Sequence, residues 1–386
     1  MTTAPPRFAV VGNPENRRVR LFQDAVRAAG LPDARVVPWL DVLRGRCRFL
    51  PDEWVRIDSP GENAEVDFLL RGVRDPSRVE GGARWYRSFN EAAGEVAVAV
   101  RDAGGTLLDD PGDLAVLFDK RLCHERLAVA GVAVPPSPTS GRAPVVGGWE
   151  DVRGHLAEPA FRRAFVKPAH GSSASGVLAV EAASGGRVHA VTSVERAPDG
   201  RLFNSLRLRR YTSESEVAAI VDALAPDGLH IERWLPKAVH RARATDLRVV
   251  VVAGKATHAV VRTSRSPLTN LHLGGERGDL AEAMAAVRAA GRSWPEHVLG
   301  LCERAAALFP GRLCVGVDVL PATAWRRFTV GEVNAFGDLL PRLTGLPGSG
   351  AAGLDTYAAQ VAAAITSHHK EPPCARPLPA LPARHR

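Results

Sequence analysis

Two apolar runs near the C-terminal end of the chain each carry their polar side chains on one face of an expected strand. No other feature constrains the fold as strongly. In GVDVL, residues 316–320, Asp318 lies on one face of an expected strand and the valines lie on the other. In VGEVN, residues 330–334, Glu332 and Asn334 share one face. Adjacent strands would bring two carboxylates and an amide together, and such hard oxygen ligands suit a Mg²⁺ that bridges substrate phosphates. The alternative, a pair of solvated edge residues, would not need these apolar flanks.

A longer apolar segment upstream predicts two more strands, and each carries an arginine. The runs at 249–253 and 256–262 flank Gly254-Lys255, which is typical of a two-residue hairpin turn. Arg248 and Arg262 lie on the strand faces that carry the other polar residues of this segment. An arginine on a buried strand is costly unless its guanidinium meets a carboxylate or a phosphate. The alternative is an exposed arginine at a strand end in an arginine-rich chain.

Lysine is rare in this chain, which makes its positions informative. Of the 50 Lys and Arg residues, five are lysines: Lys120, Lys167, Lys237, Lys255 and Lys370. The sequence is biased toward Arg, so a retained lysine is a candidate for a role that needs a compact, mobile ammonium rather than a planar guanidinium. Chance retention is the alternative.

Lys167 stands at the base of a loop of small residues between two expected strands. This loop, HGSSASG at 170–176, has no bulky side chain except its first, so its backbone N–H groups could close over phosphate oxygens. The ammonium of Lys167 could meet the same phosphates. A plain hairpin loop is the alternative, and the P-loop pattern GxxxxGK[ST] does not occur in the sequence.

Hydrophobic periodicity predicts an open α/β domain at the N-terminus and mixed α and β structure after it. The expected strands are 7–12, 66–70, 203–211, 313–320 and 328–334, besides those named above. The expected helices are 16–29, one over FDKRLCHERLAVAG that stops at Gly131, and then 280–290, 296–308 and 354–366. The first domain is expected to end near Pro111, and the Pro/Arg-rich segment 370–386 is expected to be a disordered tail.

Composition excludes several classes of protein. The 386 residues contain no apolar run approaching the roughly 18 residues of a membrane span, and the first residues lack the pattern of a signal peptide. Five cysteines without a CxxC pair favour reduced thiols, and thus a cytoplasmic protein. The net charge of +8 is spread among acidic residues, so we expect no nucleic-acid partner, although an anionic ligand is compatible with it.

These pieces, in this order, resemble the ATP-grasp superfamily over roughly residues 113–345, with the closest likeness to its glutamate-ligase and glutathione-synthase-like branches. The resemblance implies an N-terminal α/β domain at 1–112, followed by a two-subdomain ATP-grasp fold. The central subdomain would span 113–230 and carry a phosphate lid. The C-terminal subdomain would span 231–369 and carry the metal site.

The resemblance also assigns roles to individual residues. Lys120 and Lys167 resemble the two nucleotide lysines, and Gly171, Ser172 and Ser173 belong to the phosphate lid. The segment IERWL resembles the hinge that reads the adenine edge. The remaining matches are Glu232, Trp234 and Leu235 in that hinge, Arg248 and Arg262 for the γ-phosphate or acyl-phosphate, Asn270 in a polar loop beside the active site, and Asp318, Glu332 and Asn334 as metal ligands.

The sequence departs from the family at one place and contains one decoy. Family members commonly carry an acidic residue soon after the hinge that binds the ribose, but residues 233–245 contain none, so Asp246 or another contact would replace it. The segment 348–353, GSGAAG, satisfies the dinucleotide pattern GxGxxG. It does not open a βαβ unit, so a loop near the substrate is the better interpretation.

The resemblance implies a ligase that uses ATP with Mg²⁺, or Mn²⁺, to activate a carboxylate as an acyl-phosphate. An amine or related nucleophile then displaces phosphate. The partners would be ATP and a small carboxylate or peptide substrate, whereas the oligomeric state is not assigned. The alternatives are a small-molecule kinase on the same fold, a nucleotide-binding protein without turnover, and a dehydrogenase that would rest on the decoy alone.

Overall fold

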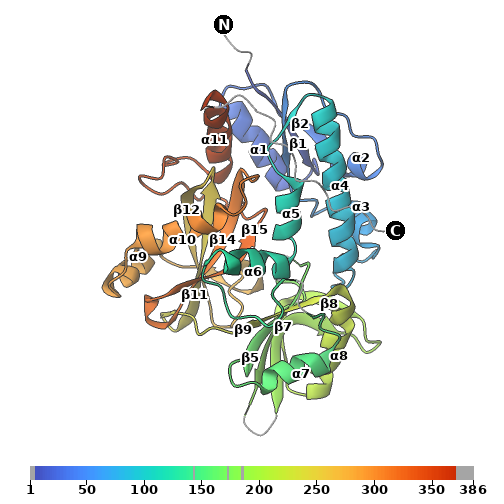
Figure 1. Cartoon of the computed structure of the whole chain (residues 1–386), viewed down its shortest axis with the longest axis vertical. Coiled ribbons are helices and arrows are strands. Elements are labelled where there is room, and N and C mark those ends of the chain that lie inside the picture. The colour runs from blue at the N-terminus through green and yellow to red at the C-terminus, as the bar shows by residue number, and fades with distance from the viewer. Residues whose placement is uncertain (1–4, 142–143, 172–173, 184–186, 371–386) are drawn as a thin grey trace.

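The computed structural model describes residues 5–141, 144–171, 174–183 and 187–370, which form three β-sheets with helices packed around them (Figure 1). Within these ranges, no helix combines the length and the apolar character of a membrane span. The four cysteines that the described ranges include are all free thiols.

The N-terminal sheet is parallel, with strand order β2-β1-β3-β4. Its elements are β1 (Arg7–Gly12), α1 (Arg17–Ala28), β2 (Arg35–Pro38), α2 (Trp39–Leu43), β3 (Glu53–Ile57), α3 (Ala64–Arg71), α4 (Gly82–Asp102) and β4 (Thr106–Leu107). The expected first strand and first helix are confirmed. Because β2 and β3 lie on opposite sides of β1, the strand order of this sheet reverses direction between β1 and β3.

The strand expected at 66–70 is wrong, because these residues lie in helix α3. The Asn63 side chain caps the helix by accepting from the Val66 amide, and Gly72 ends it in the left-handed region with φ 79°. Val66 and Leu70 are buried one helical turn apart. A run of five residues with four apolar ones fits a buried strand and a short helix equally well, and here the two caps decide for the helix.

The central sheet is antiparallel, in the order β8-β7-β6-β5-β9, and α7 and α8 cover one face of it. Its elements are α7 (Trp149–Ala157), β5 (Arg163–Pro168), β6 (Leu178–Ala182), β7 (Val188–Arg196), β8 (Leu202–Tyr211), α8 (Glu214–Leu224), the 3-10 turn η1 (Ala225–Asp227) and β9 (Leu229–Arg233). The expected strand at 203–211 is confirmed as β8. This sheet and its two helices bury a hydrophobic core of their own.

The C-terminal sheet has the order β13-β12-β11-β14-β15, with β10 paired to β11. Its elements are β10 (Val239–His240), β11 (Arg243–Val252), β12 (Lys255–Ser264), η2 (Leu271–Leu273), β13 (Glu276–Arg277), α9 (Leu280–Ala289), η3 (Trp294–Leu299), α10 (Gly300–Ala306), β14 (Cys314–Pro321), η4 (Thr323–Trp325), β15 (Phe328–Asn334) and α11 (Thr356–Lys370). The expected hairpin is shifted by one residue. Ala253 and Gly254 form the turn, with φ 46° and 77°, and Lys255 already belongs to β12.

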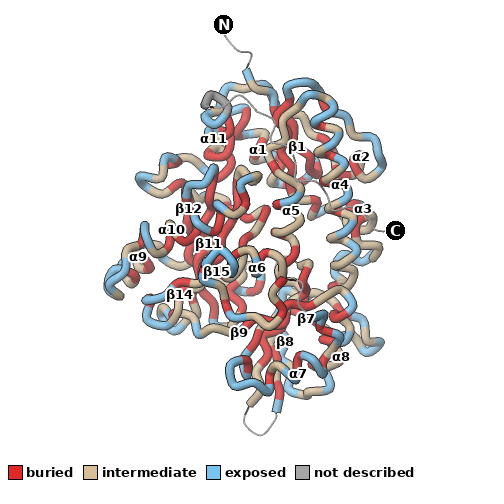
Figure 2. Tube along the Cα trace, in the orientation of Figure 1, coloured by how far each residue is buried: buried red, intermediate tan, exposed pale blue. Residues whose placement is uncertain are grey.

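The two faces of the C-terminal sheet have different surroundings. Val249, Val317 and Val319 are buried on one face and pack with α10 in a core that continues into the N-terminal domain. Figure 2 shows buried chain in red both at β11 and at β1. The helices α5 (Pro111–Leu117) and α6 (Lys120–Val129) join this core. The opposite face meets α11 at one end and turns its polar residues toward the central subdomain at the other. This polar end of the sheet holds the candidate site.

Candidate active site

An alternating set of arginines and aspartates lies across β11, β12 and β14. Register pairing puts Arg248 opposite Asp318 and Asp246 opposite Arg262. Arg248 donates from Nε to Asp318 Oδ1 at 2.5 Å and from Nη2 to Oδ2 at 3.0 Å. Arg262 donates from Nε to Asp246 Oδ1 at 2.6 Å, and its Nη2 lies 3.0 Å from Asp318 Oδ1. The structure therefore brings both predicted arginines to the predicted metal ligand Asp318.

Electrostatics favour the charged forms of Asp318 and Arg262 in this cluster. Burial by itself raises the pKa of Asp318, but the guanidiniums of Arg248 and Arg262 outweigh it and hold the pKa well below its usual range. Burial likewise opposes the charge of Arg262, yet Asp318 and Asp246 raise its pKa above the ordinary value. Charged groups are thus already oriented in the cleft before any ligand enters.

Glu332 and Asn334 reach the same place from β15. Glu332 pairs with Asp318 across the β14–β15 ladder, and Lys120 Nζ lies 2.9 Å from Glu332 Oε1. Lys120 also donates to the Gly171 carbonyl at 2.5 Å, so it links α6, the residue before the lid serines and β15. Asn334 Nδ2 donates to the Gly316 carbonyl at 3.3 Å and lies 3.5 Å from Asp318 Oδ2.

The donor set at this point fits a hard divalent cation. Asp318 and Glu332 contribute carboxylates from adjacent strands, and the Glu332 side chain retains 35% of its exposure, so it is accessible to a ligand. The described ranges contain no metal-binding group of three or more His, Cys, Asp or Glu side chains. A cation here would therefore depend on the amide of Asn334 and on oxygens of the substrate, which is how Mg²⁺ binds in nucleotide sites.

Lys167 is held by a buried polar chain that the sequence analysis did not foresee. Its Nζ lies 2.5 Å from Glu232 Oε2, and His230 Nε2 lies 3.0 Å from Glu232 Oε1. The other ring nitrogen of His230 contacts Thr139 Oγ1 at 3.0 Å. Burial by itself raises the pKa of Glu232, but the Lys167 ammonium outweighs it and holds that pKa well below its usual range. Burial lowers the pKa of His230. The alternation of His230 and Glu232 on one face of a buried strand was the available signal.

Lys237 is a second residue that the sequence analysis missed. Its Nζ donates to Thr269 Oγ1 at 2.9 Å and to the Pro267 carbonyl at 3.3 Å, and it lies 3.5 Å from Asp246 Oδ2. Burial lowers its pKa, although Asp246 opposes this. Three of the five lysines thus lie around one cleft, and the rarity of lysine was the signal that could have found this one.

The remaining predicted residues follow β9 or precede η2. Trp234 follows β9, donates its amide to the Arg163 carbonyl at 2.9 Å and stacks under the Arg163 guanidinium, and half-buried Leu235 comes next. The Asn270 carbonyl accepts from the Leu273 amide at 3.0 Å at the start of η2. Ser172 and Ser173 lie outside the described residues. The decoy at 348–353 lies in a loop and opens no βαβ unit, so it forms no dinucleotide site.

A pocket with apolar walls opens beside the charged groups, between α6 and β15. Leu117, Cys123 and Val330 contribute to its walls, and Lys120, Glu232 and Glu332 contribute its charges. Burial raises the pKa of Cys123 to about 12, so this thiol is not a nucleophile. Hydrophobic walls and a few convergent polar groups are typical of small-ligand sites.

Comparisons with known proteins identify solved structures of the same fold, although no family model and no curated protein matches this sequence. The D-cycloserine synthetase DcsG is 17% identical with a TM-score of 0.55, over 93% of this chain and 99% of that one. The ATP-grasp ligase PsnB, complexed with a minimal precursor, is 18% identical with a TM-score of 0.52, over 94% and 99%. A D-alanine–D-alanine ligase from Bacillus anthracis, complexed with ATP, is 12% identical with a TM-score of 0.50, over 95% and 99%.

Proposed function

From the ATP-grasp fold of this chain, we propose that it is an ATP-dependent ligase that joins a carboxylate to an amine or a related nucleophile. The single observation that carries the proposal is the meeting of Arg248, Arg262 and Lys120 with Asp318 and Glu332 at the polar end of the C-terminal sheet. Cations and hard oxygen ligands that alternate in one cleft are what transfer of a phosphoryl group needs.

When a nucleotide enters, the charged side chains of the cleft can exchange their present partners for phosphate and metal. In the proposed complex, Lys120 leaves Glu332 for phosphate, and Lys167 contacts the phosphates from the base of the lid. Glu332, Asp318 and Asn334 would then hold Mg²⁺. The bound cation would supply neutralisation of the phosphate charge. The edge of the base would lie against the chain at Glu232 to Leu235, where Glu232 lines the pocket between α6 and β15.

The reaction follows from this arrangement. An oxygen of the substrate carboxylate attacks the γ-phosphorus of ATP, the bond to the β-phosphate oxygen breaks, and ADP and an acyl-phosphate result. The amine then attacks the acyl carbon, and phosphate leaves with the bonding electrons while the amine loses a proton. Arg248 and Arg262 are the proposed catalytic residues, since their guanidiniums would stabilise the charge on the transferred group.

The solved structures of the same fold indicate a general substrate class. The similar structures include a D-cycloserine synthetase, an ATP-grasp ligase complexed with a minimal precursor and a D-alanine–D-alanine ligase. We propose that this chain acts on an amino acid or a peptide of the same general kind. Because these proteins differ in substrate, the screen described below offers both small and peptidic substrates.

A coupled ADP-release screen tests the proposal. Amino acids, dipeptides and short peptides are offered with ATP and Mg²⁺, and each product is weighed by mass spectrometry. We expect ADP and free phosphate in equal amounts, together with a product that has lost water. Retention of the phosphoryl group on the product would identify a kinase instead. The matched variants are Arg262→Gln, which should abolish ADP release, and Lys255→Gln, whose exposed side chain in the hairpin should not affect it.

A further inference from the structure

The turn that follows β15 lies directly against β14, and glycines make this approach possible. A Cβ on Gly337 would lie 2.5 Å from the Gly316 Cα, and a Cβ on Gly316 would lie 2.6 Å from the Gly337 Cα. Gly316 is the register partner of Asn334. The Gly337 carbonyl accepts from Arg248 Nη1 at 3.4 Å. The turn therefore packs against β14 at the position where Asn334 pairs with it.

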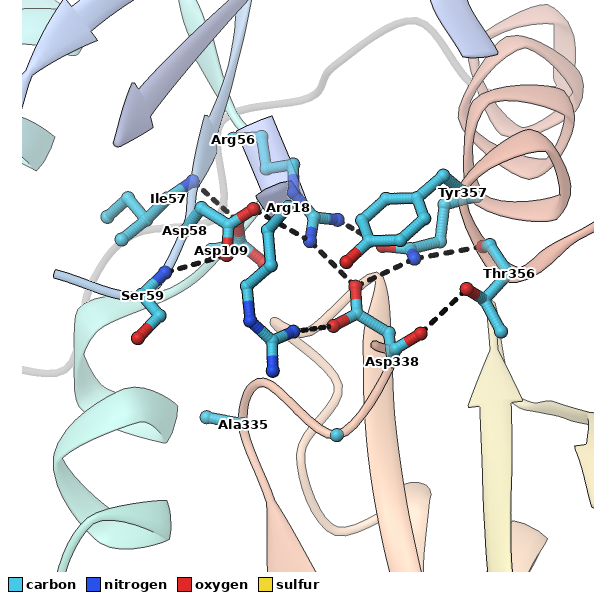
Figure 3. Close-up of polar contacts among 12 residues, drawn as sticks. Arg18, Arg56, Ile57, Asp58, Ser59, Asp109, Ala335, Asp338, Thr356 and Tyr357 are labelled. Carbon is cyan, nitrogen blue, oxygen red and sulfur yellow. Dashed lines mark hydrogen bonds and ion pairs between the residues drawn. The ribbon is translucent and has the colours of Figure 1, made fainter. Parts of the chain in front are cut away.

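Asp338 ends the turn, and its carboxylate meets side chains of the N-terminal domain (Figure 3). Oδ1 accepts from Arg18 Nη1 at 2.5 Å, and Oδ2 accepts from Arg56 Nη2 at 2.8 Å and from Gln360 Nε2 at 3.0 Å. Arg18 belongs to α1 and Arg56 to β3, which are 320 and 282 residues away in the sequence. One carboxylate thus ties α1 and β3 of the N-terminal domain to the turn after β15, the strand that carries the proposed metal ligands Glu332 and Asn334.

The backbone of the turn is fixed by the same group of residues. Arg312 donates to the Ala335 carbonyl at 2.7 Å, and Thr356 Oγ1 donates to the Asp338 carbonyl at 2.7 Å. Arg312 Nη1 in turn lies 2.6 Å from Asp109 Oδ1 at the end of the N-terminal sheet. The turn between Asn334 and Asp338 is therefore held through its carbonyl groups as well as through the carboxylate.

The charge of Asp338 is needed to balance the buried guanidinium of Arg56 and that of Arg18. Arg56 is buried, and its Nε is without a hydrogen-bond partner among the described residues. Its Nη2 lies 2.8 Å from Asp338 but 3.5 Å from Asp58. Burial raises the pKa of Asp338, but Arg56 and Arg18 outweigh it and hold the pKa well below its usual range. The carboxylate therefore stays ionised and keeps both arginines in place.

We propose that Asp338 is a positioning residue through which the N-terminal domain holds the metal-binding end of β15 in place. It acts through the turn, because the chain runs directly from Asn334, the last residue of β15, to the Asp338 carboxylate that Arg18 and Arg56 hold. The inference rests on the proposed function, since it assumes that Asp318, Glu332 and Asn334 hold Mg²⁺ with the nucleotide. It adds that the N-terminal domain takes part in building that site.

Calorimetric binding of a non-hydrolysable ATP analogue, with Mg²⁺ and with EDTA, tests this. For Asp338→Asn we expect the affinity in Mg²⁺ to fall by about tenfold or more, while the affinity in EDTA stays within about twofold, because only the coupling between metal and nucleotide is lost. Arg18→Gln removes the partner that is 17% exposed, so it should fold and show a smaller loss of the same kind.

Glu53→Gln is the matched control. Glu53 is buried in β3, accepts from Arg35 at 2.8 and 2.6 Å and from the Leu50 amide, and has no contact with the turn. It should change neither affinity. A folded Asp338→Asn or Arg18→Gln that keeps its Mg²⁺-dependent affinity overturns the inference, as does an equal loss in Mg²⁺ and EDTA. Failure of the unchanged protein to bind the analogue in Mg²⁺ overturns the proposed function, and this inference with it.

Discussion

Replacing Lys167 and Glu232 one at a time separates a nucleotide-binding lysine from one that only balances a buried acid. The two side chains retain 16% and 6% of their exposure, and their charged atoms lie 2.5 Å apart. Removal of one partner leaves the other charge uncompensated, so Lys167→Gln and Glu232→Gln should each lower the free energy of unfolding by about 3–5 kcal/mol. The loss for Lys167→Gln should become smaller once the pH falls through the folded-state pKa of His230, which burial holds below its ordinary value, because a protonated ring then faces Glu232 at 3.0 Å.

The double variant measures the pair itself. Two glutamines are neutral and can hydrogen-bond each other, so the double variant should lose less stability than the sum of the two single variants, with a coupling of about 2–3 kcal/mol. Urea unfolding followed by circular dichroism gives all four free energies. Losses that add to within about 0.5 kcal/mol would refute the existence of the pair.

Nucleotide affinity then decides the role of the lysine. Lys167→Gln should weaken binding of an ATP analogue by roughly 2 kcal/mol or more, the scale of a charge-assisted contact. Glu232→Gln should preserve the affinity or increase it, because it frees the Lys167 ammonium for phosphate. Lys255→Gln is the control and should change the affinity by less than about 0.5 kcal/mol. If Lys167→Gln and Glu232→Gln weaken binding equally, Lys167 serves Glu232 alone and the phosphate assignment is wrong.

Other parts of the site give predictions of their own. Glu332→Gln should abolish ADP release and leave the circular dichroism spectrum unchanged, since metal-mediated charge stabilisation contributes on the order of several kcal/mol; near-normal release would contradict the metal assignment. Lys237→Met should change the free energy of urea unfolding by less than about 1.5 kcal/mol, because burial already opposes the ammonium and Asp246 keeps Arg262 as a partner. Lowering the pH below about 6.5 should destabilise the protein, because burial lowers the folded-state pKa of His230 and the unfolded chain binds that proton first; His230→Gln should reduce the slope in urea unfolding by up to about 1.4 kcal/mol per pH unit.

Local patterns were sufficient for much of the fold. The acidic alternation at Asp318 and Glu332 predicted two strands and their shared face, because side chains on a strand alternate with a period of two whatever surrounds them. The hairpin of β11 and β12 was predicted within one residue. The run at 66–70 was predicted wrongly, because a short apolar run carries no periodicity that separates a strand from a helix.

The partners of the charged residues were beyond the reach of the sequence. Alternation placed Arg248 and Asp318 on inward faces, but only the order of the strands in the sheet puts them 2.5 Å apart. The rarity of lysine pointed to Lys120 and Lys167 equally. Burial then decided that one lysine faces Glu332 and the other Glu232, since a buried charge must find a counter-charge wherever the folded chain brings one.

The sequence by itself determined which residue types line the cleft, because strand periodicity and the residues at helix and turn ends act over a few neighbours. Only the tertiary structure decided that Asp338 meets Arg18 across 320 residues of chain. No local rule relates these positions, as their contact depends on the packing of α1 against α11 and on the turn after β15. A buried carboxylate is stable only where hydrogen-bond donors or cations surround it. Those of Asp338 come from distant parts of the sequence, so only the folded chain brings them together.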